Sequence, residues 1–440
     1  MYLSKNLTMQ KLMVLLVLLQ STLIVSAQNL SNTEKKIVTY INTHLPEAEK
    51  LLMETVNINS GTLNIAGVKK VGEIYGKELE KAGFTIEWVS LPDSLHRAGH
   101  LVATHKGKKG KRLFIIGHLD TVFELDMPFS NYTKLNDSTA TGQGVNDIKG
   151  GDIIAILALQ ALASEGLLQD AAITVYFTGD EEKAGVPTSV SRKDFIERAK
   201  TAEVALAFEG ANGLQSVATA RRGSSNWILN VTAKTGHSAG VFSSSAGYGA
   251  IYESARILNS FREKLSSEKY LTFNPGIIIG GSEMNYNVTK ARGEALGKTN
   301  IISPAVTVTG DLRFLTEQQK NTAREKMKAI VSQHLTGTKA EIIFSDGIPS
   351  MEPTIGNEKL LALISGITKD MGIGPTTAGD PGARGAGDIS YIAKYVDCID
   401  GLGASGKGSH APGETINLKE LPFLSQRAAL LIYRLTQMNP

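Results

Sequence analysis

Apolar and polar residues along this chain repeat with two periods, one typical of helices and one typical of strands. Amphipathic or apolar helical spacing is found at 32–60, 68–82, 150–165 and 248–261. Short apolar or alternating runs predict strands at 85–90, 100–105, 113–116, 172–178, 226–234 and 306–314. Segment 150–165 is apolar nearly all round, which indicates burial against a sheet. The alternation of such helices with short strands predicts an α/β fold with a mixed, mostly parallel sheet.

The pattern changes after Glu209 and indicates a second domain. Residues 223–344 combine half-exposed strands with a helix and read as a smaller α+β insertion, after which the α/β pattern resumes from Leu360. We therefore expect an outer α/β domain formed by 28–222 and 345–440, interrupted by the insertion at 223–344.

The basic run Lys106 to Arg112 reads K-G-K-K-G-K-R and contains the glycines of a turn. We expect it to form a solvated hairpin that joins the strand at 100–105 to the next strand. A binding patch is the alternative.

The first 27 residues have the pattern of a secretory signal. Lys5 and Lys11 give a positive start, 12–25 is mostly apolar, and Val25-Ser26-Ala27 offers a small-residue cleavage site. A membrane anchor is the alternative, but an apolar run of roughly 14 residues is too short to span a bilayer comfortably. We therefore expect a secreted or periplasmic protein that has no membrane attachment after cleavage.

Composition narrows the class of protein. With 440 residues, 42% of them apolar and 20% charged, the chain can bury a large core as one large domain or two. Lys5 and Lys11 lie in the leader and no acid does, so cleavage lowers the net charge from +3 to +1, which gives no indication of a nucleic-acid partner. The single cysteine, Cys398, excludes an intramolecular disulfide and a multi-cysteine metal site. We expect this thiol to be buried near a strand.

Candidate chemistry is concentrated in residues 114–151. The strand at 113–116 ends in Gly117 and delivers His118 and Asp120 to its C-terminal tip, where open α/β sheets place their ligands. Residues i and i+2 of an extended segment point the same way, so we expect the Asp120 carboxylate to hydrogen-bond one ring nitrogen of His118 while the other binds a metal. Asp147 follows in a glycine-rich turn just before the apolar helix.

Further candidates lie in three other loops. Gly179-Asp180-Glu181-Glu182 follows the strand at 172–178, and acidic and imidazole groups on neighbouring strand tips indicate a metal site. His237 in Gly236–Gly240 and His410 in Gly406–Glu414 are single histidines in glycine-rich loops, which are weak signals when taken alone.

Taken together, these segments resemble the dizinc carboxypeptidase and aminoacylase family, which includes glutamate carboxypeptidase, acetylornithine deacetylase, succinyl-diaminopimelate desuccinylase and the dipeptidases. The likeness is closest to glutamate carboxypeptidase and covers nearly all of the mature chain. It rests on six motifs in the family's order: G-H-L-D-T-V-F at 117–123, G-V-N-D-I-K-G-G at 144–151, G-D-E-E-K at 179–183, F-E-G at 208–210, G-H-S at 236–238 and G-S-H-A-P-G-E at 408–414.

The resemblance implies a centre of two Zn²⁺ ions bridged by Asp147. His118 and Glu209 would complete the ligands of one ion, and Glu182 and His410 those of the other. The same ligand types also accept cobalt or manganese. Glu181 would be the general base, and Asp120 would orient His118.

The resemblance also makes the insertion a lid and dimerisation domain. His237 would reach across a homodimer to stabilise the tetrahedral oxyanion, and the lid would close over the substrate. Arg313 in Asp311-Leu312-Arg313 matches a lid arginine that would hold a substrate carboxylate, and Asn285 is a second substrate-binding candidate.

One departure from the family bears on substrate choice. Glutamate carboxypeptidase carries a further arginine where this chain reads Phe344-Ser345-Asp346-Gly347. Three arginines are candidates to replace it, and ordinary surface arginines are the alternative interpretation: Arg221, Arg222 and Arg384.

The sequence therefore predicts an exported dizinc hydrolase that cleaves the amide bond of peptides or N-acyl amino acids and releases a C-terminal amino acid. A di- or tripeptide aminopeptidase of the same family is the first alternative. A metal-binding protein without turnover is the second, and it would leave Glu181 idle.

Overall fold

Six strands form the central sheet of the larger domain in the computed structural model, which describes residues 29–288 and 290–438. The expected leader at 1–27 lies outside the described residues. The strand order is β1-β2-β6-β3-β7-β16, and β6, β3, β7 and β16 run parallel while β2 is antiparallel to both of its neighbours. The expected mixed, mostly parallel sheet is confirmed. Its strands are β1 (Thr85–Val89), β2 (His100–His105), β3 (Lys109–His118), β6 (Ala171–Thr178), β7 (Val204–Ala207) and β16 (Asp397–Ile399).

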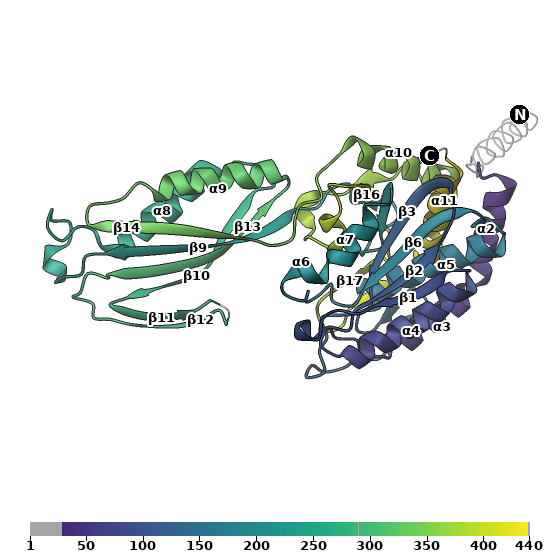
Figure 1. The fold of residues 1–440 in the computed structure, drawn as a ribbon, viewed down its shortest axis with the longest axis horizontal. Coiled ribbons are helices and arrows are strands. Elements are labelled where there is room, and N and C mark those ends of the chain that lie inside the picture. The colour runs from purple at the N-terminus through teal and green to yellow at the C-terminus, as the bar shows by residue number, and fades with distance from the viewer. Residues whose placement is uncertain (1–28, 289, 439–440) are drawn as a thin grey trace, which may run out of the picture.

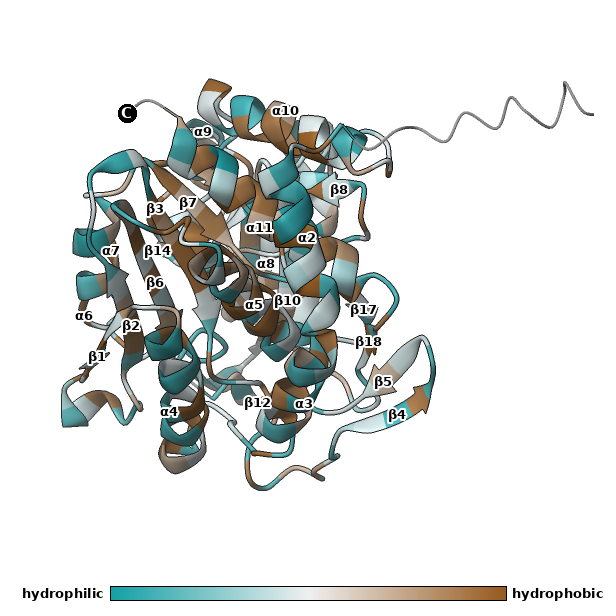
Figure 2. Cartoon of the chain, turned by 90° about the vertical axis from the view of Figure 1, so that its right-hand side faces the viewer, coloured by the Kyte–Doolittle hydropathy of each residue, from teal (hydrophilic) through white to brown (hydrophobic). Residues whose placement is uncertain are grey.

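Helices cover both faces of this sheet, which is why its strands are apolar on both sides (Figures 1 and 2). Along β3, Leu113 and Ile115 pack into a core with α2, α4, α5 and α11, whereas Phe114 and Ile116 pack into a second core with α7. Cys398 of β16 is fully buried in that second core, as expected. The covering helices are α2 (Asn32–Thr43), α3 (Leu45–Val56), α4 (Ile65–Lys81), α5 (Gly150–Ser164), α6 (Thr188–Ser191), α7 (Lys193–Ala199), α10 (Ile355–Asp370) and α11 (Leu421–Gln437).

The expected hairpin at Lys106–Arg112 is wrong. β2 and β3 are not hydrogen-bonded neighbours, because β6 lies between them, antiparallel to β2 and parallel to β3. The connection crosses the start of β6, where the carbonyl of Asp170 accepts hydrogen bonds from the amides of Lys108 and Lys109 at 2.8 Å each. Lys109–Arg112 already belong to β3.

The smaller domain is a four-stranded antiparallel sheet with two helices on one face (Figure 1). It has its own core around Trp227, Phe261 and Leu312. The expected boundary after Phe344 falls inside the last strand, which continues to Asp346. Its elements are β9 (Gly223–Ala233), α8 (Gly249–Leu265), β10 (Thr272–Gly281), β13 (Ala305–Phe314), α9 (Glu317–Val331) and β14 (Thr338–Asp346), with an outer ribbon of β11 (Glu283–Asn287) and β12 (Arg292–Leu296).

Short strands complete the larger domain and tie its C-terminal loops to the rest. They are β4 (Thr133–Asn136), β5 (Thr139–Thr141), β17 (Gly406–Lys407) and β18 (Thr415–Asn417) in one sheet, and the pair β8 (Ser216–Val217) and β15 (Thr377–Ala378). None of the helices in the described part of the chain has the length and apolarity that crossing a membrane requires.

Candidate metal centre and active site

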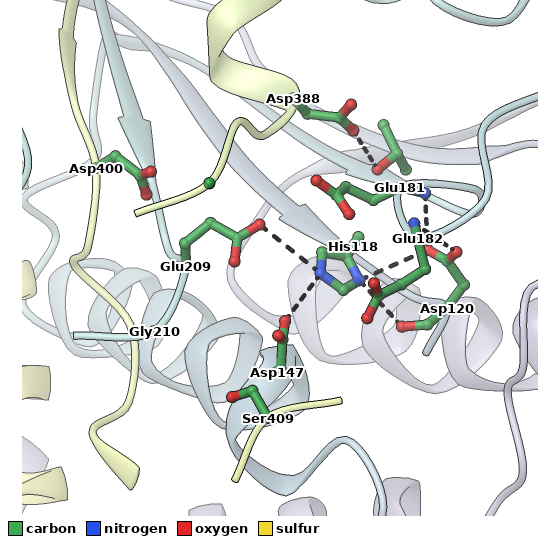
Figure 3. A network of polar contacts seen from close by, with 12 residues as sticks. His118, Asp120, Asp147, Glu181, Glu182, Glu209, Gly210, Asp388, Asp400 and Ser409 are labelled. Atoms are coloured by element: carbon green, nitrogen blue, oxygen red, sulfur yellow. Dashed lines mark hydrogen bonds and ion pairs between the residues drawn. The ribbon is translucent and has the colours of Figure 1, made fainter. Parts of the chain in front are cut away.

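Three parallel strands end at the same edge of the central sheet and carry candidate ligands there. His118 is the last residue of β3, Glu182 follows β6, and Glu209 lies two residues beyond β7. Asp147 reaches this edge from the turn before α5, and His410 comes from the loop between β17 and β18. Segments far apart in the sequence therefore converge at the carboxyl ends of parallel strands, as in other open α/β sheets (Figure 3).

The five side chains form two groups that share Asp147. One group is His118, Asp147 and Glu209, and the other is Asp147, Glu182 and His410, with the ligand atoms of each group within 4.8 Å of one another. His118 Nε2 lies 3.4 Å from Asp147 Oδ1 and 3.8 Å from Glu209 Oε1. His410 Nε2 lies 3.0 Å from Asp147 Oδ2 and 3.3 Å from Glu182 Oε2. The two oxygens of Asp147 thus face different histidines, as a bridging ligand requires.

The donor set fits two divalent cations. His118 Nε2 and Glu182 Oε1 are buried without a hydrogen-bond partner among the described residues, and such atoms carry a desolvation cost unless something binds them. Imidazole nitrogens and carboxylate oxygens are ligands that zinc, cobalt and manganese all accept. The open ligand atoms therefore point to metal rather than to a closed hydrogen-bond network.

Burial, and then the charges of the neighbouring groups, shift the pKa values in this cluster. Burial, together with neighbouring carboxylates, raises the pKa of Glu182 to about 10 and that of Glu209 to about 7. Burial also acts to raise the pKa of Asp147, but its contacts with the two imidazoles outweigh burial and lower it. Burial acts to lower the pKa of His118, and the surrounding carboxylates raise it well above its usual range. Bound cations would reverse this logic, since their charge is the largest in such a site.

Glu181 lies beside the ligands without belonging to either group (Figure 3). Burial first, and then the Glu209 carboxylate, raise the pKa of Glu181 well above its ordinary value. Its backbone amide donates to Asp120 Oδ1 at 3.0 Å, so the Asp120 side chain helps to fix the loop that carries Glu181. A carboxylate in this position is suited to accept and return a proton.

The sequence profile of peptidase family M20/M25/M40 matches residues 114–434. The chain belongs to this family. The match begins within β3 and continues almost to the end of α11, so it covers the smaller domain and the part of the larger domain that begins within β3. The expectation of a hydrolase of the metallopeptidase and amidohydrolase type is confirmed.

This M20/M25/M40 protein is also similar to individual proteins of known sequence or structure. It is 27% identical over 392 residues to carboxypeptidase G2 of Pseudomonas sp. (strain RS-16), which covers 88% of this chain and 89% of that protein. It is 24% identical to succinyl-diaminopimelate desuccinylase of Pelagibacter ubique, covering 86% of this chain and 95% of that one. Among solved structures, aminopeptidase PepT of Bacillus cereus has a TM-score of 0.71 at 17% identity and covers 89% of this chain and 98% of its own. The YXEP protein of Bacillus subtilis, a dinuclear metal-binding peptidase, has a TM-score of 0.63 at 13% identity with 90% and 100% covered. The fold is therefore that of this family.

Asp120 contacts His118, as expected, but the closer contact comes from its main chain. The ring of His118 contacts the backbone carbonyl of Asp120, with Nδ1 at 3.0 Å, while the carboxylate oxygen Oδ1 lies 3.5 Å away. The carboxylate instead accepts from the Thr62 hydroxyl at 2.7 Å and from the amides of Glu181 and Glu182 at 3.0 and 3.1 Å. Asp120 therefore fixes the histidine through its main chain and the Glu181–Glu182 loop through its side chain.

Glu414 is a site residue whose role was not predicted from the sequence. Its buried carboxylate accepts from the amides of Gly144, Asn146 and Asp147 at 2.9, 2.8 and 2.7 Å. It ties the C-terminal loop to the turn that presents the shared ligand. The only sequence signal was an acid four residues after His410 within a quoted motif.

The lid candidates do not join the cluster within this chain. His237 is exposed beyond the far end of β9, Asn285 is exposed on the outer ribbon, and Arg313 pairs with Asp311 at 2.9 Å at the end of β13 nearest the larger domain. None of the three shares a hydrogen bond or ion pair with a candidate ligand among the described residues.

The three arginines considered as replacements have different environments. Arg221 is buried and pairs with Asp400 at 2.5 Å, so its guanidinium is already occupied by a carboxylate of this chain. Arg222 donates to the carbonyl of Gly382. Arg384 donates to the carbonyl of Gly210, next to the ligand candidate Glu209.

Proposed function

We propose that this protein is a dizinc hydrolase that cleaves the amide bond of peptides or N-acyl amino acids next to a free C-terminal carboxylate. The observation that carries the proposal is the pair of ligand groups sharing Asp147, with Glu181 beside them. The 27% identity to carboxypeptidase G2 over 88% of this chain supports the carboxypeptidase branch.

His118, Asp147 and Glu209 would hold one zinc ion, and Asp147, Glu182 and His410 the other. Three carboxylates would offset most of the four positive charges, which two neighbouring cations require to coexist. When bound, zinc would lower the pKa of a coordinated water to about 7 and polarise the scissile carbonyl.

This chain's own residues would supply the proton transfers. Glu181 would take a proton from the attacking water and deliver it to the nitrogen of the leaving amine, a role typically worth about 10² to 10⁴ in rate. Asp120 would keep that carboxylate in place through the amide of Glu181. Arg313, once freed from Asp311, and Asn285 would bind the substrate carboxylate and its neighbouring groups.

The position of His237 supports a homodimer formed through the lid. β9 leaves the larger domain at Gly223 and runs for 11 residues, which at about 3.3 Å per residue spans roughly 33 Å before His237. The lid extends away from the larger domain (Figure 1). His237 would therefore donate to the developing oxyanion in the site of a second copy.

We also propose that the protein is exported, through the leader expected at 1–27, to the periplasm or the medium. The leader has the basic start and apolar stretch of a secretory signal. N-terminal sequencing of the protein from its native host would show a start at or near Gln28 if cleavage occurs there.

An aminopeptidase is the alternative, because aminopeptidase PepT and a Staphylococcus aureus tripeptidase share the fold. Substrates separate the two activities. Amino acid release would be measured from N-acyl-glutamate, N-acyl-alanine and an unblocked dipeptide, with metal-free protein and after addition of zinc.

Zinc-dependent release from the blocked substrates would support the carboxypeptidase or aminoacylase activity. Release from the dipeptide alone would replace it with the aminopeptidase. The Glu181→Gln variant should lose at least about 10²-fold in kcat while keeping two metal ions. Equal activity of this variant would refute the proposed mechanism.

A further inference from the structure

A buried arginine fork lies directly behind the loop that carries Glu181. Arg192 follows α6 and is 1% exposed. Its Nε donates to Asp388 Oδ1 at 2.7 Å, its Nη1 to Asp180 Oδ1 at 2.5 Å, and its Nη2 to the backbone carbonyl of Asp180 at 3.0 Å. We call Arg192, Asp180 and Asp388 the arginine clamp.

The clamp contacts the chain at two points just before Glu181. Asp180 immediately precedes Glu181, and Arg192 binds both its side chain and its carbonyl. Asp388 Oδ2 accepts a hydrogen bond from the hydroxyl of Thr178, the last residue of β6, at 2.7 Å. The stretch from Thr178 to Glu181 is therefore fastened by side chains that lie outside the candidate ligand groups.

The clamp and Asp120 hold the loop from opposite sides. Asp120 accepts the amides of Glu181 and Glu182, while Asp388 lies on the other side of Glu181 (Figure 3). Asp180 also accepts from the amide of Gly185 at 2.8 Å and from the hydroxyl of Ser191 at 2.8 Å. Little freedom is left for the backbone that sets the direction of the Glu181 carboxylate.

The fork geometry explains why arginine is needed at this position. One planar guanidinium reaches two carboxylates and a carbonyl at once, which the single ammonium of lysine cannot do with the same directions. Asp180 and Asp388 are also buried, at 0% and 4% exposure. Without the guanidinium, two carboxylates would remain close together and away from water, and the loop between them would shift to relieve their repulsion.

We propose that Arg192 is a positioning residue for the hydrolysis, acting through Asp180 and Asp388 to fix Glu181 and Glu182 against the metal ligands. The inference rests on the proposed function for its kinetic consequence. Its structural consequence, the placement of the ligand Glu182, stands apart from turnover. Arg192 itself is not expected to touch the substrate.

The test compares Arg192→Met and Arg192→Lys with a control at another arginine that pairs with two carboxylates, Arg434→Met. Arg434 is also forked between two carboxylates, Glu34 at 2.8 Å and Asp370 at 2.7 Å, but it lies on α11 outside the candidate site. Each full-length variant would be loaded with zinc, and kcat and KM for the best N-acyl amino acid would be measured on the folded fraction. The Co²⁺-loaded forms would be compared by their visible absorption spectra, which report on Glu182 without turnover.

We expect Arg192→Met to lose about 10²-fold in kcat, because a misplacement of about 1 Å costs that much, with KM changed by less than about threefold. The kcat of Arg192→Lys should lie between those of Arg192→Met and the wild type. The Co²⁺ spectrum should shift in Arg192→Met and stay unchanged in Arg434→Met, with two metal ions retained in both.

If Arg192→Met fails to fold, the double variant Arg192→Met/Asp388→Asn removes one of the uncompensated carboxylates and takes its place in the comparison. A kcat and a Co²⁺ spectrum equal to those of Arg434→Met would overturn the inference. A wild type that hydrolyses none of the substrates would overturn the proposed function instead. In that case the Co²⁺ spectra alone decide the inference.

Discussion

Replacing Glu414 by alanine should destabilise the protein more than the loss of any single surface acid. Its carboxylate accepts three backbone hydrogen bonds from the turn that presents Asp147, at 2.7 to 2.9 Å, and the residue is 1% exposed. Removing it leaves three N–H donors in the interior without an acceptor. The turn would have to open to water or rearrange, and the shared ligand would move with it.

The magnitude follows from the number and kind of these bonds. Burial raises the pKa of Glu414 to about 7, so the carboxylate is charged when unfolding is measured above that pH. A hydrogen bond to a charged group contributes about 1.5–3 kcal/mol net, but three bonds to one carboxylate do not add fully. We expect Glu414→Ala to lower the free energy of unfolding by about 3–5 kcal/mol, which is a large part of a typical 5–15 kcal/mol. Glu414→Gln keeps one oxygen, but it loses the hydrogen bond from Gly144 and places the side-chain N–H of glutamine against the amide N–H of Gly144. We expect this variant to lower the free energy of unfolding by about 2–3 kcal/mol. Metal affinity should fall about 10- to 100-fold in both variants.

Urea unfolding followed by circular dichroism, with and without metal, measures the free energy of unfolding. Competition with a chelator measures the metal affinity. Glu203→Ala is the control, since Glu203 also accepts a backbone amide, from Arg112 at 3.1 Å, and pairs with Lys111 at 2.9 Å, but at the surface. Glu203→Ala should lower the free energy of unfolding by about 1 kcal/mol or less. A loss for Glu414→Ala within 1 kcal/mol of this control would refute the assigned role of Glu414.

Three further outcomes are expected. Burial raises the pKa of Asp152 well above its usual range, and neither of its carboxylate oxygens has a partner among the described residues. The folded state is therefore stabilised by the proton on Asp152 at low pH and loses that stabilisation at higher pH. Urea titrations should show the free energy of unfolding of the wild type falling relative to Asp152→Asn as pH rises above about 4. Chelation should lower Tm, because metal at 1,000 times its Kd adds about 4.1 kcal/mol to the folded state; a Tm unchanged by chelation and by added zinc would count against the metal centre. Burial raises the pKa of the Cys398 thiol far above its ordinary value, so a thiol reagent should modify it only at the rate of unfolding.

The sheet was predictable where each strand carries its own signal. The apolar run at 113–116 is a strand whose alternate residues enter two different cores, and the apolar helix 150–164 packs on one face. Strand order was not predictable in the same way. The glycines of Lys106–Arg112 look like a hairpin locally, but β6, which comes some 60 residues later, pairs with both neighbouring strands and separates them. Pairing between segments distant in sequence leaves no local signature.

The structure brings together the five side chains that the family resemblance named as ligands, each from one of its short motifs, although His410 taken alone was a weak signal. The supports of these ligands were not predictable, because their partners are distant in sequence: Glu414 binds the turn at 144–147, and Arg192 binds Asp388. Asp120 illustrates the limit, since its spacing from His118 placed it correctly but did not reveal that the amides of Glu181 and Glu182 occupy its carboxylate.

The acids around the site fall into two classes that the sequence does not distinguish. Asp120, Asp180 and Glu414 each accept two or more hydrogen bonds from N–H or O–H donors, which offsets part of the cost of their burial and fixes loops in place. The carboxylates of Asp147, Glu182 and Glu209 accept none from a backbone amide or hydroxyl among the described residues and face only imidazole rings.

Leaving Glu182 and Glu209 without such donors lowers the stability of the metal-free fold, since a buried carboxylate without a donor is unfavourable, whereas the two imidazoles offset the burial of Asp147. The same lack of donors leaves their oxygens free for cations, whose binding energy then offsets the cost. Acids of the first class are needed for this arrangement, because only a rigid set of loops keeps the mutually repelling ligands close enough to share two ions. This explains why Asp120, Asp180 and Glu414, which hold the loops, are more deeply buried than most of the ligands themselves.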